Sequence, residues 1–268
     1  MGAFEAMEKN IPMIIKNPRI VVASALNLIP GLMVMILFLL AWKDFNQKYS
    51  FKDIITNAFK SNDFNEFYKS LSGIDLLSFL SPYIFGFIGI MIVMFLIDIF
   101  LNIFYTEAGR QYMSGKINMD KCVSFSIKML PRAFLAYFLA FIVLVGFSIF
   151  SLLLMTLPII NFIAIILFIA FIVFYIFTIF MIPPFVIETK ANGFDLIKKS
   201  FEFSLKNFGW ILLSFLIFWF AQITLTSSLE LIPIIGYFIL LITELFLTTW
   251  IKSMPIFLYY DILKKQAI

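Results

Sequence analysis

The chain has 268 residues, of which 62% are hydrophobic, 19% are aromatic and 13% are charged, and its net charge is +4. This apolar content exceeds what a water-soluble core requires, so the composition excludes an ordinary soluble domain and indicates a membrane protein. The absence of histidine excludes imidazole bases and histidine-ligated metal sites, and the single Cys122 cannot form an intrachain disulfide.

The apolar runs determine the fold class. One helical crossing needs about 20 residues, whereas residues 133–187 include no charged residue, so this run must cross the membrane and return. No segment alternates as barrel strands do, which leaves helices to satisfy the backbone in lipid. We predict an all-α, polytopic membrane protein with six transmembrane helices in three tandem hairpins, forming a single membrane domain over residues 1–268. The predicted spans are about 20–42, 82–106, 133–155, 158–182, 208–229 and 233–258.

The first predicted helix covers residues 3–17 and is amphipathic. Its apolar residues recur at helical spacing, which is typical of a helix at the membrane surface, and Pro12 is expected to kink it. The first crossing follows, with Arg19 before it and Trp42 and Lys43 after it as interfacial anchors.

Residues 43–74 form the long polar connection of the chain, and we expect this loop to lie outside the cytoplasm. Two short apolar stripes, beginning at Phe51 and Phe64, predict two small interfacial helices. A lid that covers the helix bundle is a simpler interpretation of them than a dedicated binding site.

Charges in the loops predict the orientation. With six crossings, one side of the membrane receives 15 of the 20 Lys and Arg residues, and the other side receives the five in the long loop. The positive-inside rule therefore predicts a multi-pass protein of the cell membrane with both termini in the cytoplasm.

An internal repeat connects these elements. Each unit would consist of an amphipathic elbow helix, a crossing, an outer turn with a proline, and a returning crossing that ends in an acid. The Lys16, Asn17 and Ser24 spacing recurs 190 residues later, and LPIINF resembles IPIIGY in the later outer turns. The turn prolines are Pro82, Pro158 and Pro233, the closing acids are Glu107, Glu188 and Asp261, and the repeated residues are Lys206, Asn207 and Ser214.

The third elbow, residues 183–210, carries a set of residues that looks like a known family. The set comprises Pro184, Phe185, Glu188, Gly193, Lys198, Lys199, Ser200, Phe201, Glu202, Asn207 and Phe208. This pattern resembles the six-span membrane domain of glycerophosphoryl diester phosphodiesterases and of related uncharacterised membrane proteins.

The resemblance implies the membrane part of that family only. The catalytic members carry a separate soluble domain with paired acids and histidines, and nothing in this sequence offers those groups. Leu196 also stands where the family usually has a small residue, so helix packing at this elbow is expected to differ. We assign no catalytic residue, no metal site and no cofactor.

Ionisable and polar residues inside the predicted spans are candidates for a functional site: Asp98, Asn102, Glu244 and Lys252. A charge at the centre of the bilayer costs about 3 kcal/mol, so each should face the bundle interior and have a partner. Asp98 precedes Glu107 by nine residues, and Lys252 precedes Asp261 by nine residues. The equal spacing places Asp98 and Lys252 at similar depth in the membrane and predicts an ion pair between them. The pair would be either a staple that joins the first hairpin to the third or a polar site on a transport path, and the low polarity of the spans favours the staple.

Basic residues of the elbows are candidates for contact with lipid headgroups, although ordinary interfacial anchoring also explains their placement. Ser200 and Ser204 have no base nearby in sequence and are interpreted as helix-packing residues. Cys122 is interpreted as a small apolar packing residue, rather than a site of lipidation or redox chemistry. The headgroup candidates are Lys121, Lys128, Arg132, Lys198, Lys199 and Lys206.

Three functions are consistent with these features of the sequence. The first is a non-enzymatic integral membrane protein that contacts or organises lipid. The second is a transporter or channel for a small or lipidic solute, which would use Asp98, Glu244 and Lys252. The third is a membrane subunit of a partner enzyme. Expected partners are membrane lipids and a possible protein subunit, with no nucleic acid, because the basic residues lie beside apolar spans.

Overall fold

The computed structural model describes residues 2–49, 76–155, 161–230 and 235–266, and all regular elements within these ranges are helical. The two small helices expected in the long loop, and the turn prolines Pro158 and Pro233, lie outside the described residues. Six helical stretches in the described ranges are long and apolar enough to cross a membrane, so the predicted all-α, six-span class is confirmed.

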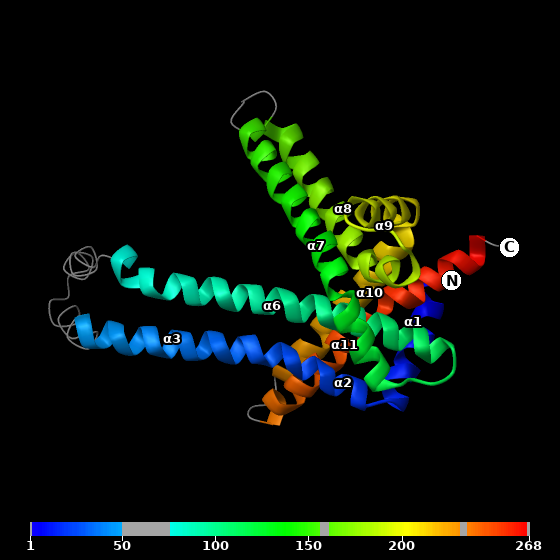
Figure 1. Ribbon diagram of the computed structural model, residues 1–268, viewed down its shortest axis with the longest axis horizontal. Coiled ribbons are helices and arrows are strands. Elements are labelled where there is room, and N and C mark those ends of the chain that lie inside the picture. The colour runs from blue at the N-terminus through cyan, green and yellow to red at the C-terminus, as the bar shows by residue number, and fades with distance from the viewer. Residues whose placement is uncertain (1, 50–75, 156–160, 231–234, 267–268) are drawn as a thin grey trace. The chain divides into compact units, whose positions relative to one another are not determined.

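The helices follow one another along the chain as shown in Figure 1. They are α1 (Gly2–Lys16), α2 (Arg19–Ala23), the 3₁₀ helix η1 (Ser24–Asn27), α3 (Leu28–Tyr49), α6 (Leu76–Met113), α7 (Met119–Met155), α8 (Asn161–Glu188), α9 (Phe194–Lys206), α10 (Phe208–Glu230) and α11 (Ile235–Gln266). The chain divides into two compact units, one of residues 26–97 and one of residues 1–25 with 98–268.

The unit of residues 26–97 is built from α3 and the first part of α6. These two helices run antiparallel, because the Tyr83 hydroxyl donates a hydrogen bond to Asp44 while Gly86 faces Leu37 further along. A Cβ atom at Gly86 would lie 3.2 Å from a Leu37 methyl carbon, so glycine allows the two helices to approach closely. Trp42 stacks near Phe38 on the same helix, at a centroid separation of 6.5 Å.

In the larger unit, α7 and α8 form an antiparallel hairpin (Figure 1). Phe147 and Phe171 stack across it with ring centroids 3.8 Å apart. The outer surface of the hairpin is apolar, since Phe150 is 56% exposed and Leu153 is 63% exposed. An apolar surface of this kind suits lipid as the surrounding solvent.

The elbow helix α9 packs on α8 through two serines. The Ser200 hydroxyl donates to the Thr178 carbonyl oxygen at 2.6 Å, and the Ser204 hydroxyl donates to the Phe177 carbonyl oxygen at 3.1 Å. Both serines and Leu196 are fully buried. The packing interpretation of the two serines is therefore confirmed, and the bulkier Leu196 lies within the same interface.

The elbow helix α1 packs on α11 in a similar manner, although the two helices lie at opposite ends of the chain. The Asn10 amide nitrogen donates to the Trp250 carbonyl oxygen at 3.0 Å, and its amide oxygen accepts from the Ser253 hydroxyl at 2.7 Å. This contact joins the first elbow to the last returning crossing.

The ends of α1 and α9 show the same local structure. The Asn17 amide donates to the Met13 carbonyl oxygen at 3.0 Å, and the Asn207 amide donates to the Phe203 carbonyl oxygen at 2.9 Å. Each asparagine thus satisfies a carbonyl group in the last turn of its helix. The recurrence of Asn17 as Asn207 that the sequence indicated has a structural counterpart.

The remaining elbow is the first part of α7. The Asn118 side chain caps this helix by accepting a hydrogen bond from the Lys121 backbone N–H at 3.0 Å. Cys122 and Ser126 are fully buried, whereas Ile127 is 59% exposed. Small residues therefore form the inner face, and the packing interpretation of Cys122 is confirmed.

Candidate functional site

The three closing acids of the repeat each lie at the end of a returning crossing, on α6, α8 and α11. Glu107 is 2% exposed and Asp261 is 5% exposed. Each of the three acids, Glu107, Glu188 and Asp261, accepts a hydrogen bond from another side chain. Buried carboxylates need such partners, because an unpaired charge away from water is costly.

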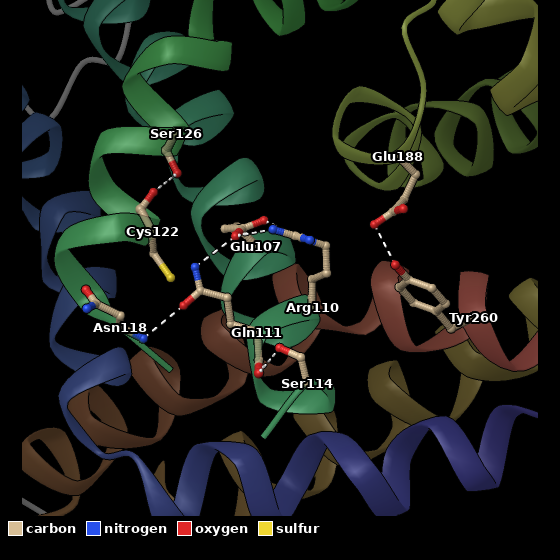
Figure 2. Close-up of polar contacts among 9 residues, drawn as sticks. All are labelled: Glu107, Arg110, Gln111, Ser114, Asn118, Cys122, Ser126, Glu188 and Tyr260. Atoms are coloured by element: carbon tan, nitrogen blue, oxygen red, sulfur yellow. Dashed lines mark hydrogen bonds and ion pairs between the residues drawn. The ribbon is translucent and has the colours of Figure 1, made fainter. Parts of the chain in front are cut away.

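Glu107 is held by two residues of the next helical turn (Figure 2). The Arg110 guanidinium donates to both of its oxygens, with Nε at 2.7 Å and Nη2 at 2.8 Å, and the Gln111 amide donates at 2.8 Å. The Gln111 side-chain oxygen in turn accepts from the Asn118 backbone N–H at 2.9 Å, just before α7. The chain of contacts links the end of α6 to the start of the second elbow.

The other two acids join different helices. Glu188 accepts a hydrogen bond from the Tyr260 hydroxyl at 2.6 Å, which connects α8 to α11 (Figure 2). The Oδ1 atom of Asp261 forms an ion pair with Lys9 on α1 at 2.9 Å. The Oδ2 atom of Asp261 is buried and has no hydrogen-bond partner within the described residues.

A pocket of about 840 Å³ opens between the middle of α1 and the C-terminal ends of α6 and α11. Lys9, which pairs with Asp261, and Arg110, which pairs with Glu107, both line the pocket. Both cations remain accessible, since the Lys9 side chain is 50% exposed and that of Arg110 is 43% exposed. The sequence did not predict this pocket. Its lining residues are Lys9, Arg110, Tyr112, Met113, Ser114, Phe257, Tyr260, Asp261 and Leu263.

Among the predicted polar residues of the spans, the structure brings three together. Lys252 forms the predicted ion pair with Asp98, and the Asn102 amide donates to the second oxygen of Asp98 at 3.0 Å. The Lys252 side chain is 10% exposed, whereas that of Asp98 is 54% exposed. Glu244 makes no hydrogen bond or ion pair with any described residue, so it does not belong to this cluster.

A smaller cavity of about 240 Å³ lies beside the ion pair. Asn102 and Lys252 line part of it, and Tyr137 from α7 hydrogen-bonds to Asn102 at its edge. The rest of its wall is mainly aliphatic and aromatic. The wall is completed by Ile176, Ile179, Phe180, Pro183, Phe215, Ile251 and Pro255.

A buried cluster of hydroxyl groups was missed from the sequence. The Ser24 hydroxyl lies 2.5 Å from the Tyr105 hydroxyl and 2.8 Å from the Thr249 hydroxyl, and all three residues are fully buried. The cluster joins η1 to helices α6 and α11. The recurrence of Ser24 in the repeat was the one signal in the sequence, but single hydroxyls in apolar runs do not reveal their partners.

Arg132 has a partner that the sequence did not predict. Its guanidinium donates to the backbone carbonyl oxygens of Val186 at 3.0 Å and Thr189 at 2.5 Å, and its Nε donates to that of Ala191 at 2.8 Å. Val186 lies in the last turn of α8, where helical carbonyl groups lack intrahelical partners, and Thr189 and Ala191 follow the end of the helix. Arg132 therefore caps α8, which accounts for most of its donors.

The five lysine candidates of the elbows are all exposed. One of them, Lys198, lies at a groove of about 410 Å³ between α9 and the α7–α8 hairpin. Phe171, Tyr175, Phe194 and Phe201 provide much of the groove wall, so a cation stands next to an aromatic surface.

Comparisons with known proteins gave no assignment: no family model, no curated protein and no solved structure matches this chain. The residues quoted for the resemblance at the third elbow do have identifiable structural positions. Gly193 adopts a positive φ of 49° before α9, Ser200 bonds to α8, and Asn207 completes the last turn of α9. Within the described ranges, no three metal-ligating side chains lie together.

Proposed function

We propose that this protein is a non-enzymatic, multi-pass protein of the cell membrane whose elbow helices contact lipid at the cytoplasmic surface. The support comes from the two faces of α9. One face is buried against α8 and fixed by two serine hydrogen bonds. The opposite face leaves Phe194 63%, Phe201 42% and Leu205 51% exposed.

The exposed face of α9 has the composition of an interfacial helix. Phe194, Phe201 and Leu205 recur at spacings of seven and four residues, which places them on one side of the helix. Lys198, four residues after Phe194, lies on the same side, and Lys206 lies further round the helix. Both can reach anionic headgroups, each contributing about 1 kcal/mol of attraction. A fixed inner face holds the apolar outer face at one depth in the bilayer.

The adjoining groove supports contact with an acyl chain as well as with a headgroup. Its walls are aromatic, and Lys198 stands at its rim. An acyl chain in the groove would keep its headgroup near this cation. The arrangement favours a lipid over a soluble substrate, since the groove surface is mainly apolar apart from Lys198, Asp195 and Thr178.

Site-directed spin labelling tests this proposal directly. In a Cys122→Ala background reconstituted in nanodiscs, a label at Phe201→Cys should be more accessible to oxygen than to a polar nickel chelate. A label at Glu202→Cys is the matched control on the adjacent exposed position, and it should show the reverse preference. Equal accessibility of both labels to the nickel chelate would contradict the proposal.

The proposed orientation has a separate test. Lys121→Cys and Lys198→Cys should both resist a membrane-impermeant maleimide applied to intact cells, and both should react after the membrane is opened. Labelling of one position from outside the cell would refute a shared cytoplasmic side.

The cavity beside the Asp98–Lys252 pair favours a second candidate, transport of a small or lipidic solute. A charged pair beside a pocket within the spans is typical of a solute path in transporters. If transport is the function, Asp98→Asn should change ion or solute flux across proteoliposomes without unfolding the protein. Unchanged flux with lower stability would favour the staple.

A further inference from the structure

The pocket between α1 and the C-terminal ends of α6 and α11 contains an unsatisfied buried group. Asp261 is 5% exposed, its Oδ1 atom is paired with Lys9, and its Oδ2 atom is buried with no partner among the described residues. A buried carboxylate oxygen normally accepts a hydrogen bond. Asp261 lines the pocket, and since Oδ2 itself is shielded from the pocket space, a rotation of the carboxylate would present this oxygen to a ligand with an N–H donor.

The charges around the pocket favour a ligand that carries both signs. Its two cations, Lys9 and Arg110, are each paired with a buried acid, Asp261 and Glu107 respectively. Each cation of the wall is therefore already paired with an acid, which makes the pocket a poor site for a simple anion or a simple cation. A zwitterion can instead place each of its charges near the opposite charge of one pair.

Arg110 has donors left for a phosphate group. Glu107 occupies Nε and Nη2, and Nη1 has no hydrogen-bond partner within the described residues. The pairing with Glu107 also fixes the plane of the guanidinium, so its remaining N–H groups are oriented in advance. Lys9, on a different helix, adds a second cation to the pocket wall.

The apolar part of the pocket suits the remainder of a lipid. Met113 and Leu263 line it and are 39% and 37% exposed, and Phe257 completes this side. The volume of about 840 Å³ exceeds what a headgroup alone requires. The polar and apolar parts therefore match a headgroup that is attached to a glycerol backbone.

We propose that this pocket binds a phosphate group linked to a primary ammonium group, as in an ethanolamine phospholipid. The phosphate lies between Arg110 and Lys9, and the ammonium group donates to Oδ2 of Asp261. The proposal deepens the proposed lipid contact and rests on the placement of this end of the bundle among headgroups.

Native mass spectrometry of the purified protein in detergent tests the proposal with four lipids. Phosphatidylethanolamine, its N-methyl and N,N-dimethyl derivatives, and phosphatidylcholine share the phosphate but lose N–H donors in steps. Retention should fall most at the last step, to phosphatidylcholine, which alone lacks an N–H donor, with roughly a tenfold difference between the ends of the series, since one charge-assisted hydrogen bond provides about that ratio. Equal retention of all four lipids would overturn the proposal.

Two variants test whether Asp261 causes the preference for phosphatidylethanolamine over phosphatidylcholine. Asp261→Asn should abolish the difference between phosphatidylethanolamine and phosphatidylcholine, whereas Lys116→Gln, an exposed cation outside the pocket, should leave it unchanged. A preference that persists in Asp261→Asn would refute the assignment. If this variant does not fold, the methylation series on the wild-type protein still decides the question.

Soluble glycerophosphoethanolamine distinguishes the source of the ligand. Displacement of the lipid at equal concentration would assign the pocket to a soluble molecule, and failure to displace it would assign the pocket to membrane lipid. Both outcomes support the shared chemistry. Because the measurement is made in detergent, it can succeed even if the spin-label depths disprove the proposed contact of α9 with the bilayer.

Discussion

The α8–α9 contact and the α1–α11 contact each join an elbow helix to a returning crossing, but different side chains make the hydrogen bonds. In each, polar groups of an elbow helix donate to backbone oxygens of a returning crossing. On α9 the donors are serines that contact a helix 22 to 27 residues earlier, while on α1 the donor is Asn10, which reaches Trp250 across 240 residues. The contrast shows that the same kind of contact forms between neighbouring elements and between the two ends of the chain, where the first elbow packs on the last crossing.

Substitution of Gly109 should cost the most stability, because α6 approaches α11 closely there. A Cβ atom at Gly109 would lie 2.5 Å from a methyl carbon of Ile256. Gly109→Val should therefore lower the free energy of unfolding by about 3 kcal/mol through overpacking. Thermal unfolding in detergent measures the effect.

Gly146→Val is the control for this substitution. Nothing lies within 4 Å of a Cβ atom placed at Gly146, so the same change should leave the unfolding temperature nearly unaltered. Equal effects of the two substitutions would show that valine itself, and not the α6–α11 contact, causes the loss.

Asn10→Ala should have the second largest effect on stability, because it removes the hydrogen bonds between α1 and α11. The substitution deletes two hydrogen bonds and leaves a space in a fully buried position. We expect a loss of about 2 kcal/mol in an SDS unfolding titration. Asn17→Ala, whose amide bonds only within its own helix, is the control and should cost less.

The Asp98–Lys252 pair provides a third, independent test, of the contact between α6 and α11. A double-mutant cycle with Asp98→Asn and Lys252→Met should give a coupling energy of about 1 kcal/mol if the pair is a staple. The estimate is modest because the Asp98 side chain is 54% exposed. Additive effects in the unfolding titration would show that the pair does not stabilise the fold.

Ser204→Ala should cost the least and tests the contact between neighbouring elements. It removes one hydrogen bond to α8, and the Phe177 carbonyl oxygen can retain its helical hydrogen bond. The expected loss in the unfolding titration is about 0.6 kcal/mol, which is typical of a single interhelical bond in membranes. A loss of stability as large as that of Asn10→Ala would mean that the α8–α9 contact and the α1–α11 contact are equally important to stability.

Much of the architecture could be predicted because lipid imposes simple rules. The length of the uncharged runs predicted six spans, and the equal distances to the closing acids predicted the depth of Asp98 relative to Lys252. Depth follows from sequence because each helical residue adds a fixed rise.

Other features could not be predicted because they depend on which helices pack against one another, and the sequence alone does not show this. Arg132 appeared as one of several elbow cations, but its partners depend on where α8 ends, and its guanidinium caps that helix. The pairing of Ser24 with Tyr105 and Thr249 depends on which helices adjoin. The pocket between α1 and the C-terminal ends of α6 and α11 is formed by distant segments, so no local pattern could have revealed it.

The contact between α1 and α11 constrains how the protein is made. Ribosomes synthesise the N-terminal segment first, so Asn10 emerges some 240 residues ahead of the main-chain oxygen that it will bind. Until the final crossing enters the bilayer, this amide and the Ser24 hydroxyl must find temporary partners, such as interfacial water or the insertion machinery. The α1–α11 contact therefore forms late, and nascent chains truncated before Thr249 should remain susceptible to membrane quality-control proteases.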